Sequence, residues 1–327
     1  MYDLREFIDK AYDAIGKHNI GQVGKYRRWL KQDEKNSRDM EASVYGASLA
    51  TDIYYTLGGI PETEREGLIR EIKAYQDPLD GLFKYEGSVV CHTTAFAAGA
   101  LELLDAVPDY KAEGFSEYIT KDGIYAFMDK IDWDNDPWLG AHWGAGIYGS
   151  MLLTGMSSDE WEDYYFDWLD KNEDMNNGLW MGKESKAPLF HYIAAAFHYV
   201  FNYEYAKRPI KEVDKILDTC IDAYNHNEEC KMVFDRPGWP YIDFTYLLVH
   251  AQRRSGKRFE ESQIIIKNLC DKLMNMILNE NNKYDVFDDM NNFLAVISAI
   301  AVMQDVIPGY IKTSKPLSLI LDRRPFI

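Results

Sequence analysis

Cysteine is scarce in this chain, and its distribution excludes two kinds of site. The four cysteines, Cys91, Cys220, Cys230 and Cys270, are far apart and form no Cys-x-x-Cys pair. A disulfide framework or a thiolate zinc site needs cysteines at close and regular spacing. We therefore expect the four cysteines to be packing residues, as free cysteines commonly are. We predict neither a bound metal nor a cofactor.

The chain also lacks long apolar runs and an excess of basic residues. No stretch approaches the ~18 apolar residues of a membrane span, and Met1–Lys17 is charged and amphipathic, without the apolar region of a secretory signal. The 36 lysines and arginines are outnumbered by 53 aspartates and glutamates, which gives a net charge of -17. Such a charge repels nucleic acid and anionic lipid. These features predict a cytoplasmic protein that binds neither nucleic acid nor membranes.

What the chain does contain is enough apolar material for a large core. Hydrophobic residues make up 46% and aromatic residues 14% of its 327 positions, which argues against disorder. The length by itself allows two domains. A repeat along the whole chain instead favours a single domain over residues 1–327.

Six segments rich in small and apolar residues recur about every fifty residues. They are Glu41–Leu57, Val89–Val107, Ala141–Thr154, Leu189–Tyr205, Tyr241–Ser255 and Asp289–Val306. Between them lie amphipathic stretches with charged faces, which are typical of surface helices. One helical hairpin needs about this length. The sequence therefore predicts an all-α fold, an (α/α)6 toroid of six helical hairpins with inner and outer helix layers; an open solenoid is the alternative.

Turn residues followed by an apolar anchor lead into several inner segments, for example Asp80-Gly81-Leu82-Phe83 and Asn177-Gly178-Leu179-Trp180. In these turns the chain resembles the unsaturated glucuronyl hydrolases and related (α/α)6 glycoside hydrolases, in which Asp-Gly-Leu-Trp-like turns precede inner helices. The stretch Gln76–Phe83 also resembles the repeats of the prenyltransferase and squalene-cyclase group. Both resemblances imply the toroid; the first implies a sugar substrate and the second an isoprenoid one.

The resemblance to the cyclases is incomplete. The acidic loop Asp132-Trp133-Asp134-Asn135-Asp136 lacks the Asp-x-Asp-Asp spacing of squalene-type cyclases, and only Cys91-His92 suggests the zinc ligands of protein prenyltransferases. The resemblance to the hydrolases identifies turns and helix starts but no catalytic carboxylate. Candidate site residues must therefore come from local chemistry.

Three histidines are the sharpest candidates for a site. His92, His142 and His191 occupy matching positions near the starts of the second, third and fourth inner segments, so a closed ring turns them toward one cavity. The helix dipole disfavours positive charge there, which predicts neutral imidazoles that can accept a proton. Their alternative roles are satisfying buried backbone groups and, although no ligand pair such as His-x-x-x-His supports it, binding a metal.

Acids and a set of aromatic and amide residues complete the predicted site. Asp243 has the matching position in the fifth segment, and we predict that it contributes to turnover, with helix capping as its alternative role. Asp136, Asp80 and Asp289 are the candidates for a second carboxylate. The predicted substrate contacts are Tyr45, Phe83, Trp138, Trp143, Trp180, Tyr192, Trp239, Tyr241, Asn291 and Asn292. Flat apolar faces beside hydrogen-bonding groups suit a sugar ring.

The sequence thus predicts a carbohydrate-active enzyme, a glycoside hydrolase or lyase that acts on a short or unsaturated oligosaccharide in a central cavity. Hydrolysis needs two carboxylates that flank the bond, whereas elimination can use a neutral histidine with a tyrosine. The alternatives are a terpenoid-cyclase-like or prenyltransferase-like enzyme with an apolar cavity, and a non-catalytic ring that binds a ligand or a protein. The sequence leaves the substrate and the oligomeric state open.

Overall fold

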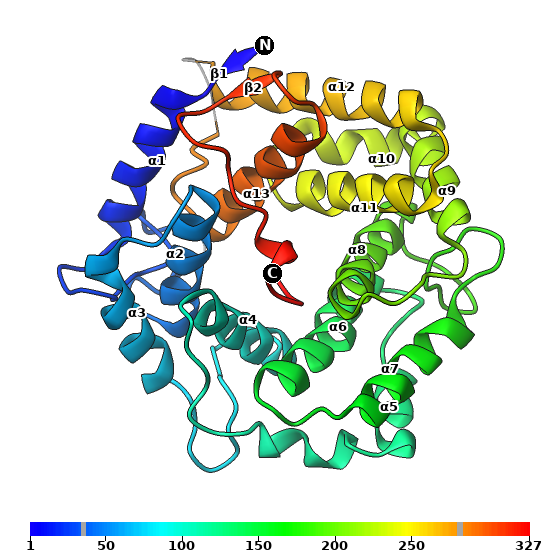
Figure 1. Cartoon of the computed structure of the whole chain (residues 1–327), viewed down its shortest axis with the longest axis horizontal. Helices are drawn as coiled ribbons and strands as arrows, with labels where there is room; N and C mark the ends of the chain where they lie inside the picture. Colours follow the sequence, from blue (N-terminus) through cyan, green and yellow to red (C-terminus); the bar gives the residue numbers. More distant parts are fainter. Residues whose placement is uncertain (34–36, 280–283) are drawn as a thin grey trace.

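The computed structural model describes residues 1–33, 37–279 and 284–327, whose helices form an inner and an outer layer (Figure 1). The inner helices are α2 (Val44–Thr56), α4 (Val90–Leu103), α6 (Pro137–Leu153), α8 (Leu189–Ala206), α11 (Trp239–Ser255) and α13 (Met290–Val306). Each contacts the next along the chain, and α13 contacts α2. The predicted all-α class is confirmed, and the contacts of the six inner helices run in cyclic order.

The outer layer consists of one helix before each inner helix. These are α1 (Arg5–His18), α3 (Glu62–Ala74), α5 (Lys121–Met128), α7 (Asp159–Asn172), α9 (Val213–His226) and α12 (Phe259–Ile277). Shorter elements are α10 (Glu228–Met232) and the 3-10 turns Glu113–Tyr118, Val233–Asp235 and Ile320–Asp322. Two short parallel strands, β1 (Tyr2–Asp3) and β2 (Ile311–Lys312), join the start of the chain to the segment after α13.

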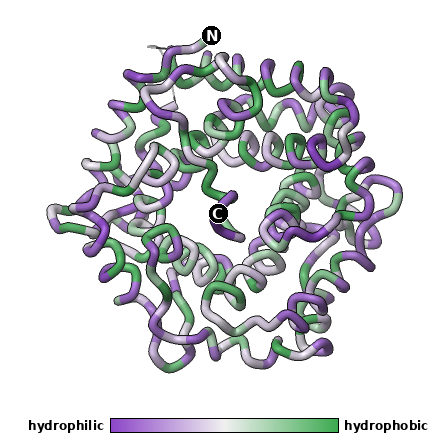
Figure 2. The backbone as a smooth tube through the Cα atoms, in the orientation of Figure 1, coloured by the Kyte–Doolittle hydropathy of each residue, from purple (hydrophilic) through white to green (hydrophobic). Residues whose placement is uncertain are grey.

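The two layers differ in hydropathy as the repeat predicted. Every residue from Phe293 to Met303 in α13 is buried, because protein surrounds that helix on all sides. On the outer coils hydrophilic and hydrophobic residues alternate, as Figure 2 shows, since each outer helix has one face in water. Helix α6 begins at Pro137, earlier than the predicted start at Ala141, because Asp136 caps it and proline suits a first turn.

Small residues bring α4 and α6 into backbone contact. A Cβ atom on Gly146 would lie 2.9 Å from both the Cys91 carbonyl carbon and the His92 nitrogen. The Ser150 hydroxyl donates a hydrogen bond to the Cys91 carbonyl oxygen at 2.9 Å. The two helices therefore approach closely at the level of His92, which sets the position of its side chain against α6.

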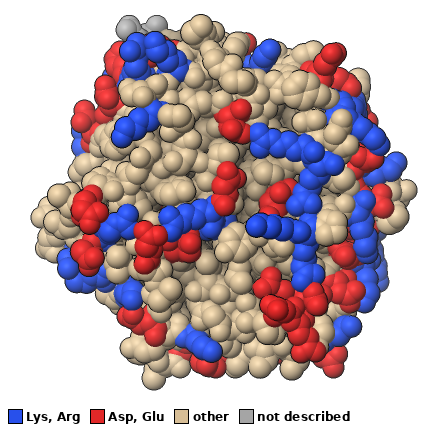
Figure 3. Space-filling model, in the orientation of Figure 1, with Lys and Arg blue, Asp and Glu red and all other residues tan. Residues whose placement is uncertain are grey.

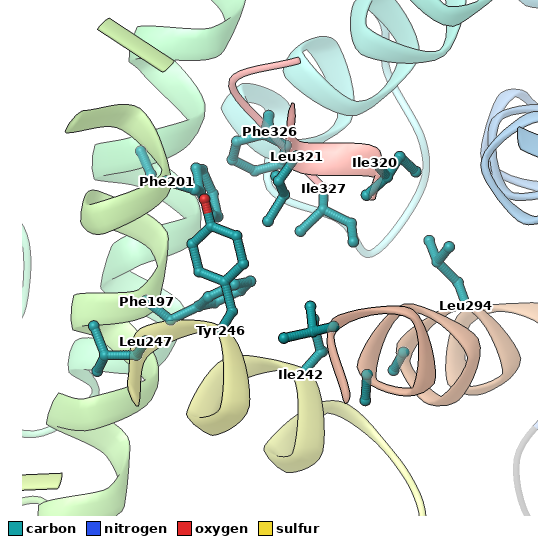
Figure 4. Packing of buried hydrophobic residues seen from close by; sticks show 14 of the residues in the cluster. Phe197, Phe201, Ile242, Tyr246, Leu247, Leu294, Ile320, Leu321, Phe326 and Ile327 are labelled. Carbon is teal, nitrogen blue, oxygen red and sulfur yellow. The ribbon is translucent and has the colours of Figure 1, made fainter. Parts of the chain in front are cut away.

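The segment after β2 turns back into the middle of the ring, where Figure 1 shows the C-terminus. Figure 4 shows the side chains of Ile320, Leu321, Phe326 and Ile327 among those of α8, α11 and α13, and all four are buried. Sequence analysis did not predict this segment, which we call the central tail (residues 320–327). The tail fills the centre of the ring.

The outer surface carries charges of both signs, and neither sign dominates on the face shown. On the face shown in Figure 3, basic and acidic side chains are interspersed, and many of them pair, as Arg258 does with Asp218 at 2.8 Å. Among the described helices, none combines the length and the apolarity that crossing a membrane takes.

Candidate functional site

A cavity of about 970 Å³ lies where α2, α4 and α6 begin. Its polar wall includes Arg28, Arg38, Tyr45, Tyr85, His92 and His142. Inner helices begin at this end of the ring, so their unpaired N–H groups and positive dipole ends are directed toward it. The cavity is the part of the predicted site that the structure assembles.

Two of the three predicted histidines line this cavity. The ring centroids of His92 and His142 lie 4.8 Å apart. His191 is at the same end of the ring but packs on Trp138 at 5.7 Å and does not line the cavity. A histidine that sequence analysis missed, His198, has its ring 5.2 Å from that of His142. The signal was available, since His198 follows His191 by seven residues and so shares its helix face.

Burial keeps the imidazoles of His92, His142 and His198 neutral. It lowers the pKa of His142 to about 4 and the pKa of His198 to about 3. The pKa of His92 is lowered well below its ordinary value, first by burial and then by the neighbouring imidazoles. The neutral form matches the sequence prediction, but its main cause is burial rather than the helix dipole.

One tautomer is set by the backbone. Nδ1 of His198 lies 2.8 Å from the carbonyl oxygen of Ala194; because a carbonyl only accepts, Nδ1 carries the proton and Nε2 of the neutral ring has the lone pair. His92 has no such anchor. Its Nδ1 is buried without a hydrogen-bond partner among the described residues.

Arg28 also lines the cavity and supplies a fixed positive charge there. Sequence analysis missed it because it precedes the first repeat. Its Nε and Nη2 donate to the two carboxylate oxygens of Asp289 at 2.7 and 2.9 Å. Its guanidinium carbon lies 4.3 Å from the ring centre of Trp29 and 5.5 Å from that of Tyr45. The bidentate pair uses two of the five N–H groups of the guanidinium.

Tyr45 lies near both Arg28 and His92. Its hydroxyl donates to Oδ1 of Asn291 at 3.1 Å, so the predicted positions of the first and sixth repeats meet. Its ring stacks on Tyr85 at 5.4 Å and lies 6.1 Å from that of His92. Burial raises the pKa of Tyr45 above its ordinary value, which leaves a protonated hydroxyl that can donate.

Asp243 is not in the cavity. It is fully buried in α11, and among the described residues neither of its carboxylate oxygens has a hydrogen-bond partner. Burial raises its pKa well above the ordinary value, which favours the neutral form of the acid in the core. Asp243 therefore does not line this cavity, and its contribution to turnover stays a prediction.

Four of the predicted aromatic contacts are corrected in the same way. Fully or almost fully buried in the core are Phe83, Trp180, Tyr192 and Tyr241. Their polar atoms are used within the fold; Nε1 of Trp180, for example, donates to the carbonyl oxygen of Leu169 at 2.9 Å. These residues are anchors for the loops, whose apolar side chains fold beneath the helix starts instead of into the cavity.

Trp143 and Asp136 lie on another side of α6. Trp143 is 38% exposed and lines a groove of about 440 Å³ with Phe127 of α5 and Asp136. Consecutive residues point about 100° apart on a helix of 3.6 residues per turn, so Trp143 cannot face the same way as His142. Asp136 caps the helix by accepting a hydrogen bond from the Leu139 nitrogen at 3.3 Å.

The remaining predicted contacts are half-buried at the helix starts. Trp138 packs on Phe190 at 5.9 Å, Trp239 begins α11, and Asn292 lies so close to Gly238 that a Cβ there would be 2.7 Å from its Oδ1. None of the three lines the cavity. They surround the same end of the ring.

No metal position is evident in the part of the chain that the structure describes, since no group of three or more His, Cys, Asp or Glu side chains is arranged to hold an ion. Comparison of the chain with models of protein families, with curated proteins and with solved structures found no match. The protein is thus described by its fold and its cavity alone: it is an all-helical ring with a polar, histidine-lined cavity at one end.

Proposed function

We propose that the protein is an enzyme that cleaves an acidic oligosaccharide by elimination in this cavity. The observation that carries the proposal is the presence of two neutral imidazoles, His92 and His142, in one cavity with the hydroxyl of Tyr45 and the cation of Arg28. Elimination beside a sugar carboxylate needs a base, an acid and a group that binds the carboxylate. These residues are of those three types.

Each residue has a defined task. A guanidinium binds a carboxylate through directed N–H groups, so Arg28 holds the acidic sugar. His142, the more exposed imidazole, takes the proton from the carbon next to the carboxylate; the electron pair forms a carbon–carbon double bond, and the bond to the leaving oxygen breaks. Tyr45 gives its proton to that oxygen. His92 lies between the two and returns the proton from His142 to Tyr45.

The aromatic faces around the cavity fit a sugar ring. The guanidinium carbons of Arg28 and Arg38 lie 4.3 and 4.1 Å from the centre of the Trp29 ring. Rings held in this way present rigid faces with polar groups at their edges. The same charged wall disfavours an isoprenoid chain, because its polar groups would be desolvated without a partner.

Elimination is favoured over hydrolysis by the position of the acids. Hydrolysis needs one carboxylate on each side of the bond. Of the predicted candidates, Asp243 lies in the core and Asp136 lines the groove beside Trp143. The other two are held in ion pairs, Asp289 by Arg28 and Asp80 by Lys84. The acids that do line the cavity are Asp33, Asp39 and Glu86. Asp39 and Glu86 are exposed side chains. As part of this proposal we place the enzyme in the cytoplasm, in keeping with its four free cysteines.

The test uses uronate-containing and neutral oligosaccharides, saturated and unsaturated, between about pH 5 and 8. Elimination creates a double bond conjugated to a carboxylate, which absorbs in the ultraviolet, whereas hydrolysis gives new reducing ends without that absorbance. His142→Gln should lower kcat by ~10²-fold or more. His191→Gln is the matched control, because His191 lies outside the cavity, and it should leave kcat nearly unchanged.

Three results would count against the proposal. Reducing ends without absorbance would assign hydrolysis. Tight binding of an acidic oligosaccharide without turnover would make the ring a binding protein. Equal loss of kcat in the two histidine variants would show that the cavity is not the site.

A further inference from the structure

The central tail contacts His92, one of the two cavity histidines, from the interior of the ring. Phe326 is fully buried, with its ring 5.1 Å from that of His92 and at 85° to it. On its other side the ring of Phe201 lies 5.6 Å away, also edge to face. Figure 4 shows Phe326 beside Phe201 in the middle of the ring. A residue near the end of the described chain therefore touches a residue of α4 at the cavity.

Packing rather than hydrogen bonding orients His92. A functional histidine is commonly held by a hydrogen bond from one ring nitrogen to a carbonyl or carboxylate, as His198 is held by Ala194. Nδ1 of His92 has no such partner among the described residues. What surrounds its ring are other rings: Phe96 at 5.8 Å and Phe326 at 5.1 Å, in addition to the cavity residues.

The tail is itself held firmly, so it can act as a support. The guanidinium of Arg324 lies 2.5 Å from the carboxylate of Asp52, and both side chains are completely buried. The Asn202 side-chain amide donates to the Pro325 carbonyl oxygen at 2.8 Å. Each partner is on a different inner helix, α2 or α8, and these contacts place the next residue, Phe326, within the ring.

The inner helices carry glycines where the tail passes. A Cβ atom on Gly99 would lie 2.9 Å from Nη1 of Arg324, and one on Gly149 would lie 3.2 Å from Cβ of Phe326. Side chains at these two positions would displace the tail. The space for the tail is therefore part of the sequence of α4 and α6.

We propose that Phe326 is a positioning residue for His92, and that the central tail is the floor of the functional cavity. The edge of Phe326 fixes the plane of the imidazole and shuts water out from beneath it, so that a ring without a hydrogen-bond anchor keeps one orientation toward His142 and Tyr45. The inference rests on the proposed function where it concerns turnover; the positioning itself is independent of any substrate.

Phe326→Ala tests the positioning by nuclear magnetic resonance of the imidazole Cε1–Hε1 groups. The His92 signal is identified by its loss in His92→Gln. In the parent, burial holds the pKa of His92 well below its ordinary value, so this signal should not titrate between about pH 5.5 and 8. In Phe326→Ala water reaches the ring, and the midpoint should move up toward the ordinary value of about 6.5.

Leu321→Ala is the matched control, because Leu321 is also a buried residue of the tail but packs toward α11. It should leave the His92 signal as in the parent. If Phe326→Ala does not fold, Phe326→Leu keeps the test decisive: a smaller apolar side chain should give a shift in the same direction. A titration of His92 that is unchanged in folded Phe326 variants, or equally changed in Leu321→Ala, would overturn the inference.

The turnover arm separates this inference from the proposed function. With a substrate in hand, Phe326→Ala should lower kcat about tenfold with little change in KM, because misorientation of a catalytic group affects the transition state more than binding. If the parent turns over no oligosaccharide, the proposed function fails while the resonance result still decides whether Phe326 positions His92.

Discussion

The molecule contains two arginine–aspartate pairs in opposite surroundings. At the cavity, Arg28 and Asp289 form a bidentate pair whose side chains are 23% and 17% exposed. In the centre, Arg324 and Asp52 make one contact, and both are 0% exposed. In the central pair Nε and Nη1 of the arginine and Oδ1 of the aspartate have no hydrogen-bond partner among the described residues.

The difference shows what each region contributes. In an ion pair next to water both charges stay solvated, and one partner can be exchanged for a ligand. In a buried ion pair each charge has lost its water, so removing one partner leaves the other charge unpaired in the core. Burial raises the pKa of Asp52 to about 7, although Arg324 opposes the shift. The cavity pair thus suits binding, and the central pair determines where the tail lies.

The largest effect is expected from breaking the central pair. Arg324→Met should lower the free energy of unfolding by about 3–5 kcal/mol, because it leaves an unpaired acid in the core. The loss should be smaller at pH 5 than at pH 8. With Arg324 present, the folded-state pKa of Asp52 is about 7. Removing Arg324 raises this pKa further, so below about pH 7 Asp52 is protonated in both proteins. Above that pH only the parent releases the proton and gains the paired charge, and the difference in stability grows.

Urea unfolding of two further variants makes the comparison sharp. Arg28→Met removes the same cation from the cavity pair and should reduce stability by only about 1 kcal/mol. The double variant Asp52→Leu, Arg324→Met removes both central charges and should be more stable than Arg324→Met alone. Equal losses in the two single variants would show that the regions do not differ as described.

A buried acid without a cation provides the next test. Asp243→Asn should gain stability relative to the parent as the pH rises from about 4 to 8. Burial raises the pKa of Asp243 in the folded protein, so the parent's advantage is fully present below the unfolded pKa and is lost as the pH rises through the folded one. The slope is at most about 1.4 kcal/mol per pH unit.

Denaturant unfolding of both proteins across this range measures the slope. Asp305→Asn is the control, since Asp305 is partly exposed and paired with Arg253 on the surface. A constant difference between Asp243→Asn and the parent would mean that Asp243 is ionised in the folded protein, which would restore it as a candidate for catalysis.

The smallest effect is expected at Gly146, where α6 contacts the backbone of α4. Gly146→Ala places a methyl group against the backbone of α4, and overpacking of about 1–3 kcal/mol outweighs the gain in helix propensity of up to about 1 kcal/mol. We expect a net loss of about 1 kcal/mol and a wider separation of His92 and His142. Gly16→Ala in α1, where a Cβ would have no neighbour within 4 Å, should instead be neutral or stabilising. Melting temperatures of the two variants check the difference in sign.

How much of the site was predictable varied with the type of residue. His92 and His142 were found because each is near the start of an inner helix, and adjacent helices of a ring turn matching positions alike. Trp180, in the turn before α8, and Tyr241, in the first turn of α11, were misplaced for another reason. An aromatic residue near a helix start looks the same in sequence whether it lines a cavity or packs in the core. Only burial distinguishes the two.

By itself, the sequence determined the all-helical class and pointed to His92 and His142 as site candidates, because the spacing of apolar residues along the chain records which face of each helix is buried. The tertiary structure alone decided which residues join them. Arg28 meets Asp289 across 261 positions, and Arg324 meets Asp52 across 272. Contacts at such separations depend on ring closure and on the path of the tail, and no local pattern of residues records either.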